Sequence, residues 1–281
     1  MDIEVLGAVA VRVNGVSITP TAPKPRQVLA LLALHADRVV PVSALIEELW
    51  DTTPPRSART TLQTYILQLR ELISVALEKD EREGPQGESE RRVAKNVLVT
   101  MPGGYLLSSA DGRSDVRTFE RLAGTGYRAM DAGDFAGAAR QLREALALWS
   151  GTAFADVQAG AQLEMEIKRL EESRLCALDQ RIEADLRLGR HRELLAELTV
   201  LVNRYRTHES LHAQFMLALR RSGRRGEALD VYQRLRTTLV RDLGLEPSAG
   251  LRRLQQSILT AGHESAAEAP DAAKGRLAPT S

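Results

Sequence analysis

The chain has 281 residues, enough for two domains that each bury a hydrophobic core. Hydrophobic residues make up 43% of it and charged residues 27%, and the formal net charge is +1, which is typical of a soluble globular protein. No apolar run reaches the roughly 18 residues that a membrane span needs, and the first residues lack the basic region of a signal peptide. The single cysteine, Cys176, cannot form an internal disulfide. We therefore predict a cytoplasmic protein without a membrane partner.

The first 110 residues are predicted to form a strand hairpin, three helices and a second hairpin. Apolar and polar residues alternate on both sides of Asn14-Gly15, a dipeptide typical of hairpin turns. The helices are expected at about 26–35, after two prolines, at 43–50 with Ser43 as N-cap, and at 58–72; the second hairpin turns at 102–104. This order is that of a winged helix-turn-helix, in which the last helix before the wing enters the DNA major groove.

The segment "ARTTLQTYILQLREL", residues 58–72, has an apolar stripe and an unusual opposite face. Leu62, Ile66, Leu69 and Ile73 follow the spacing of a buried helix face. The other face carries threonines and glutamines flanked by arginines, which can donate to and accept from bases and phosphates, whereas Lys/Glu pairs are usual on a solvated helix.

Ten residues are the candidate DNA contacts. Threonines near the start of the helix are expected to reach bases, glutamines to pair with adenine, and arginines to hold phosphates. Two polar residues before the wing are further candidates for phosphate contacts. The predicted set is Arg56, Arg59, Thr60, Thr61, Gln63, Thr64, Gln68, Arg70, Lys95 and Asn96.

Overall charge gives little support to nucleic-acid binding. Residues 1–110 contain 12 Lys and Arg against 13 Asp and Glu, although a DNA-binding domain is usually basic. Six of the acids lie in the low-complexity stretch 78–92, which is predicted to be a solvated loop. Residues 52–76 carry three arginines and one glutamate, so positive charge is concentrated where the recognition helix is expected.

The rest of the chain is predicted to be all α-helical and tetratricopeptide-like. Similar stretches start at Gly133, Gly189 and Gly223, and the second and third are 34 residues apart, the period of that helix pair. Each glycine is expected to end a helix, and the residue five positions later to pack against the next helix. A long helix interrupts the array, and a last helix follows Ser248 as N-cap. The predicted domains are 1–110 and 111–262, with a disordered tail at 263–281.

Two parts of the sequence resemble a known family. "PKPRQVLALLALHADRVVPVSALIEELWDTTPPRSARTTLQTYILQLREL" with "VLVTMPGGYLL" is similar to the OmpR-type DNA-binding domain of the Streptomyces antibiotic regulatory proteins. "RLEESRLCALDQRIEADLRLGRH" and the segment from Leu211 to Leu259 resemble the bacterial transcriptional activation domain of the same family. The wing departs from the OmpR pattern because its tip, Met101-Pro102-Gly103, has no basic residue.

The resemblance implies a sequence-specific transcription activator of the small, stand-alone type. Such a protein is expected to bind direct repeats in double-stranded DNA upstream of promoters in an antibiotic or other secondary-metabolite gene cluster, as a side-by-side homodimer. It is expected to recruit RNA polymerase holoenzyme through its sigma factor and alpha subunit. That function requires no cofactor, metal or catalytic residue.

Three alternatives compete with this interpretation. "HESLH", His208 to His212, fits the HExxH pattern of a zinc site, but no further histidine follows at zincin spacing. "GTGYRA" from Gly124 imitates a dinucleotide fingerprint without a preceding strand. The helical repeats also suit an interaction scaffold that grips a partner on a concave face, with the first domain as a docking module.

Overall fold

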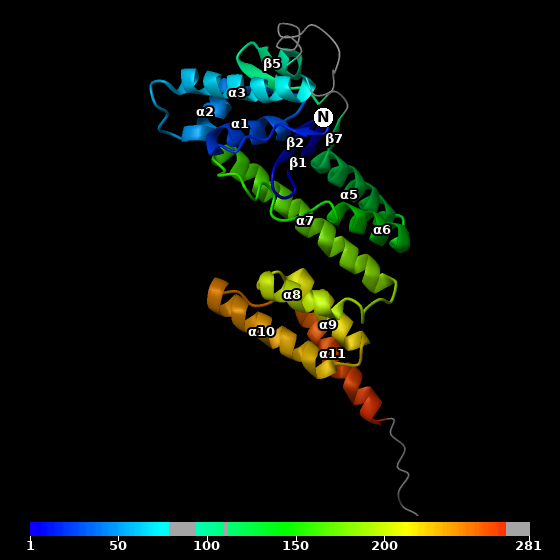
Figure 1. Cartoon of the computed structure of the whole chain (residues 1–281). Coiled ribbons are helices and arrows are strands. Elements are labelled where there is room, and N and C mark those ends of the chain that lie inside the picture. Colours follow the sequence, from blue (N-terminus) through cyan, green and yellow to red (C-terminus); the bar gives the residue numbers. More distant parts are fainter. Residues whose placement is uncertain (79–93, 110–111, 268–281) are drawn as a thin grey trace, which may run out of the picture. The chain divides into compact units, whose positions relative to one another are not determined.

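The computed structural model describes residues 1–78, 94–109 and 112–267, with side chains to residue 260, so the predicted loop lies almost wholly outside the described residues. The chain forms two compact units, Met1–Gln180 and the part from Arg181 on (Figure 1). The division falls inside one long helix, α7 (Ala161–Arg187), at the place where the sequence predicts one.

A four-stranded sheet opens the first unit. Its strand order is β3-β2-β1-β7, with β1 at Asp2–Glu4, β2 at Ala10–Val13, β3 at Val16–Ser17 and β7 at Arg113–Ser114. Val13 pairs with Val16 across the predicted hairpin turn, where Asn14 and Gly15 both have positive φ angles of 50° and 77°. That backbone shape matches the twist of the two strands and explains the Asn-Gly pair.

The winged helix-turn-helix follows. Its helices are α1 (Pro23–Leu34), α2 (Val42–Trp50) and α3 (Ala58–Glu78). A second sheet of order β4-β6-β5 consists of β4 (Val39–Pro41), β6 (Gly104–Leu107) and β5 (Leu98–Met101). The antiparallel strands β5 and β6 form the wing beside α3 (Figure 1). The predicted fold class, a winged helix-turn-helix followed by an all-α part, is confirmed.

The predicted domain boundary at residue 110 does not coincide with a break in packing. Strand β7 lies beyond it and pairs in parallel with β1. The Asp115 carboxylate accepts hydrogen bonds from the backbone N–H groups of Val5 and Leu6, at 2.6 and 2.8 Å. Burial raises the pKa of Asp115, although these backbone donors oppose the rise. Helices α5 (Asp115–Asp131) and α6 (Phe135–Leu146) and much of α7 share one hydrophobic core with the winged helix.

Glu48 provides a second connection between the winged helix and α7. This side chain on α2 is only 2% exposed. Its carboxylate accepts from the backbone N–H groups of Gly160 at 2.6 Å and Leu163 at 2.9 Å, and from Nε2 of Gln27 at 2.8 Å. Glu48 therefore satisfies free donors at the N-terminus of α7, as a capping residue would, but from another helix.

The second unit continues from the end of α7 with four helices of the described chain: α8 (Leu195–Arg204), α9 (Glu209–Arg221), α10 (Arg225–Leu243) and α11 (Ala249–Ala267). Helix α9 packs against both α8 and α10.

Gly133, Gly189 and Gly223 have φ angles of 75°, 78° and 79°, the left-handed conformation expected after a helix end. The residues five positions later are all buried, as predicted: Ala138, Leu194 and Ala228.

Local differences from the predicted elements have simple causes. Ser43 is not an N-cap, because α2 begins at Val42 directly after Pro41. Strands β4 and β7 were not expected, since two or three residues are too few to show alternation. Ser248 does accept from the Leu251 N–H. Helix α11 continues to Ala267, past the expected start of the tail at residue 263, and residues 268–281 lie outside the described chain.

Candidate nucleic-acid interface

Helix α3 has the two faces that its sequence predicts. Leu62, Ile66, Leu69 and Ile73 are each no more than 2% exposed and pack in the core of the first unit. Because this stripe anchors the helix, the opposite face is directed to solvent along the length of the helix. The polar face is therefore presented on a rigid element, as base recognition in a groove requires.

The predicted threonines and glutamines are not equally accessible. The side chains of Thr60, Gln63, Thr64 and Gln68 are exposed, whereas Thr61 is half-buried. The Thr64 hydroxyl donates to the Thr60 carbonyl at 3.1 Å, so its oxygen can still accept from a partner. The structure thus brings four of these five residues to one exposed helix face.

Two arginines lie at the N-terminal end of α3. Arg56 is in the turn before the helix, and Arg59 is in its first turn; both are exposed. Among the described residues, no carboxylate forms an ion pair with either guanidinium. Their charges add to the positive end of the helix macrodipole, which favours an anion such as a phosphate.

Arg70 has a different environment from the one expected of a free phosphate ligand. It is half-buried, and its Nε and Nη2 donate to the Leu98 carbonyl at 3.1 and 2.8 Å. Nη2 also donates to Oγ1 of Thr100 at 2.7 Å, and burial lowers the pKa of the guanidinium. Because Leu98 and Thr100 belong to β5, Arg70 fixes the wing to α3. Sequence spacing could not show this contact between residues about thirty positions apart.

Lys95 and Asn96 are both exposed and lie in a short helical stretch, residues 94–97, that leads into β5. The wing itself turns at Pro102-Gly103, where Gly103 adopts a φ of +77°. Both residues lie before the wing, at the position that the sequence predicts. In the described chain neither side chain forms a hydrogen bond or ion pair with α3.

The exposed surface also has an apolar component that was not among the candidates. Leu67 on α3 is 58% exposed, and Met101 at the wing tip is 36% exposed. An apolar side chain on a base-reading helix can contact the methyl group of thymine. The signal was present in the helical wheel, because Leu67 interrupts an otherwise polar face.

The HExxH residues of the second unit have structural roles. His208 is the N-cap of α9, and its Nδ1 accepts from the Leu211 N–H at 3.3 Å. Glu209 accepts from the Ser248 N–H at 2.8 Å, and His212 is buried with its ring against the His208 carbonyl. Among the described residues, no three His, Cys, Asp or Glu side chains lie close enough together to hold a metal ion. No helix among them is long and apolar enough to span a bilayer.

Comparison with known proteins supports the arrangement of a winged helix-turn-helix domain followed by a helical domain. The family model "Bacterial transcriptional activator domain" matches residues 114–259, and "Transcriptional regulatory protein, C terminal" matches residues 17–83. The regulatory protein DnrI of Streptomyces peucetius is 54% identical over 261 residues, which cover 93% of each chain. The chain belongs to the Streptomyces antibiotic regulatory protein family.

Other relatives of this antibiotic regulatory protein are longer. AfsR of Streptomyces coelicolor is 36% identical, over 92% of this chain but 24% of the relative. The solved structure of EmbR from Mycobacterium tuberculosis, in complex with a low-affinity phosphopeptide, is 33% identical with a TM-score of 0.80 and covers 92% of this chain and 65% of that one. These relatives are transcriptional regulators, and the family is not enzymatic.

Proposed function

We propose that this antibiotic regulatory protein is a cytoplasmic activator that binds direct repeats upstream of promoters in a secondary-metabolite gene cluster. Residues 1–110 supply the DNA contacts, and residues 111–262 supply the surface that recruits RNA polymerase through its sigma factor and alpha subunit. The observation that carries the proposal is the exposed polar face of α3, which a fully buried stripe holds in place.

On this proposal each candidate residue other than Arg70 has a stated task. Arg56 and Arg59 hold phosphates or reach a guanine, and Gln63 and Gln68 pair with adenine. Leu67 contacts a thymine methyl group. The remaining contacts are assigned to the threonines and to the residues before the wing: Thr60, Thr61, Thr64, Lys95 and Asn96.

Side-by-side binding of two protomers follows from repeats spaced by one helical turn, which present successive recognition helices on one face of the duplex. Recruitment then needs no chemistry. Contacts to DNA and to polymerase each raise the effective concentration for the other.

The test is a salt titration of binding to a direct-repeat duplex and to a random duplex. We expect a clear preference for the repeat and an affinity that falls steeply with salt. Arg59→Ala should cost about 1–3 kcal/mol of binding free energy if Arg59 reads a guanine. Arg12→Ala is the matched control, because Arg12 is a half-buried arginine on β2, away from α3, and pairs with Glu4. Equal affinity of the Arg59 variant and the control, or no binding at low salt, would contradict the proposal.

A further inference from the structure

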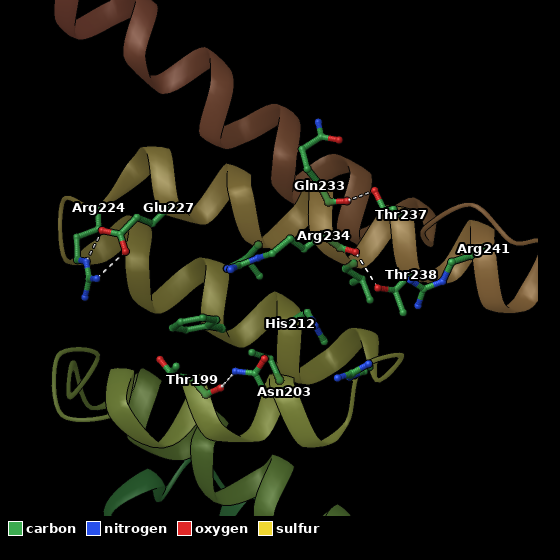
Figure 2. Close-up of a pocket in the computed structure, with 15 residues that line it drawn as sticks. Thr199, Asn203, His212, Arg224, Glu227, Gln233, Arg234, Thr237, Thr238 and Arg241 are labelled. Carbon is green, nitrogen blue, oxygen red and sulfur yellow. Dashed lines mark hydrogen bonds and ion pairs between the residues drawn. The ribbon is translucent and has the colours of Figure 1, made fainter.

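The second unit contains a groove that the DNA-binding proposal does not use. It has a volume of about 680 Å³ and lies among α8, α9 and α10 (Figure 2). Thr199 and Asn203 line it from α8, His212 from α9, and Arg234 and other residues from α10. A volume of this size is within the roughly 300–1,000 Å³ typical of ligand sites.

The groove residues follow helical spacing, so whole helix faces form the walls. On α10 five of the lining positions are three or four residues apart: Glu227, Val231, Arg234, Thr238 and Arg241. On α8 they are Thr199, Val202 and Asn203, and Arg206 lines the groove from the turn that follows α8. Phe215 on α9 and Val231 and Leu235 on α10 are 7%, 2% and 1% exposed and provide an apolar floor.

The charge around this floor is strongly positive. Four arginines and a single glutamate line the groove, in a chain whose formal net charge is only +1. Arg224 is neutralised by Glu227 through two hydrogen bonds of 2.7 and 2.6 Å. Arg241 pairs with Asp242, which is outside the groove lining. Burial lowers the pKa of His212, so at neutral pH the positive charge is that of the arginines.

Two of the groove arginines form no close ion pair. Arg206 and Arg234 are exposed, and within the described chain no Asp or Glu lies at ion-pair distance from either; Asp242 and Glu227 interact with them electrostatically at longer range. Arg234 lies on α10 near His212, between the Arg224–Glu227 pair and Arg241 (Figure 2). Guanidinium groups bind carboxylates in a bidentate manner, which makes both residues suited to acidic side chains.

We propose that this groove binds an acidic segment of a partner protein, with an apolar side chain on the Phe215 floor and carboxylates on Arg206 and Arg234. The apolar floor favours a peptide over a nucleic acid, whose exposed backbone offers charge without a matching apolar group. The threonine and asparagine side chains on the rim can bond to peptide amides. The inference rests on the proposed function in that the partner belongs to the transcription machinery, but the binding step is independent of DNA.

The test uses a fluorescein-labelled synthetic peptide with glutamates on both sides of a leucine, and a matched peptide with glutamine at every glutamate position. Fluorescence anisotropy with the full chain should show binding of the acidic peptide only, weakening with salt. Arg206→Glu with Arg234→Glu should lower the affinity by about tenfold or more, because like charges then face each other. The control, Arg252→Glu with Arg253→Glu on α11, makes the same charge change outside the groove and should alter affinity less than about twofold.

Several results would overturn the inference. Equal binding of the glutamine peptide, or unchanged affinity of the Arg206/Arg234 variant, would remove the charge complementarity. Displacement of the peptide by a random DNA duplex would make the groove a nucleic-acid surface. If circular dichroism shows that the charge-reversal variant is misfolded, Arg206→Gln with Arg234→Gln replaces it.

The experiments distinguish a failure of the groove proposal from a failure of the DNA-binding proposal. A groove variant that keeps operator affinity but loses promoter activation supports both. Normal operator binding and activation by a chain that does not bind the peptide would refute the groove alone. Peptide binding without operator binding would refute the DNA-binding function alone.

Discussion

Replacing Glu48 by glutamine tests how the winged helix is joined to the helical part of the first unit. The carboxylate accepts from Gly160 N–H, Leu163 N–H and Gln27 Nε2 while only 2% exposed. In Glu48→Gln the side chain keeps its shape, but an NH₂ group replaces one acceptor oxygen and faces a donor. The exchange leaves a buried N–H without a partner and removes the charge from the other hydrogen bonds.

The magnitude follows from these contacts. A hydrogen bond to a charged group contributes about 1.5–3 kcal/mol, a neutral one about 0.5–1.5 kcal/mol, and an unsatisfied buried group costs about 1–3 kcal/mol. Allowing for non-additivity, we expect Glu48→Gln to lower the free energy of unfolding of the first unit by about 2–4 kcal/mol. That is a large part of the roughly 5–15 kcal/mol that stabilises a typical domain.

Tryptophan fluorescence in a urea titration measures this change selectively. The protein has two tryptophans, Trp50 and Trp149, and both lie in the first unit. The matched control is Glu47→Gln, because Glu47 is the exposed neighbour and makes one hydrogen bond of 2.7 Å, from Gln162. We expect the control to change stability by less than about 0.5 kcal/mol. Equal unfolding midpoints for the two variants would refute the capping role of Glu48.

Three further predictions follow from the described contacts. Arg70→Ala should lower DNA affinity by releasing the wing from α3, and the slope of log affinity against log salt concentration should not change. A slope whose magnitude is smaller by about 0.9 in the variant would show that Arg70 contacts a phosphate instead. Deleting residues 188–281 should preserve the tryptophan fluorescence and DNA affinity of the first unit but abolish activation in a promoter assay. Deleting residues 111–281 should instead unfold the winged helix, because it removes Asp115. A folded protein consisting of residues 1–110 would contradict the second expectation. Burial lowers the pKa of His212, so the folded protein keeps this ring neutral just below pH 6.5, where the unfolded chain takes up a proton. The free energy of unfolding should therefore decrease as the pH is lowered below 6.5, by at most about 1.4 kcal/mol per pH unit, and this decrease should be smaller in His212→Gln. A ring titration by NMR with a midpoint at or above 6.5 would contradict the prediction.

Sequence patterns were sufficient where neighbours along the chain determine the structure. The stripe from Leu62 to Ile73 follows from helical periodicity, and the left-handed glycines at 133, 189 and 223 follow from the backbone shape at a helix end. The hairpin at Asn14-Gly15 depends on two residues alone. The order of these elements was then enough to predict the winged helix and the exposed face of α3.

Tertiary structure decided the contacts between distant parts of the chain. Glu48 and Leu163 are 115 residues apart, and Asp115 and Val5 are 110 apart, so no local spacing indicates that they meet. Nothing in the sequence distinguishes Glu48 from its exposed neighbour Glu47. Glu48 is buried because the N-terminus of α7 packs beside it. The groove arginines likewise acquire their common environment only when α8, α9 and α10 pack together. Local patterns determine secondary structure and buried faces, whereas the partners of a charged side chain depend on the three-dimensional packing that surrounds it.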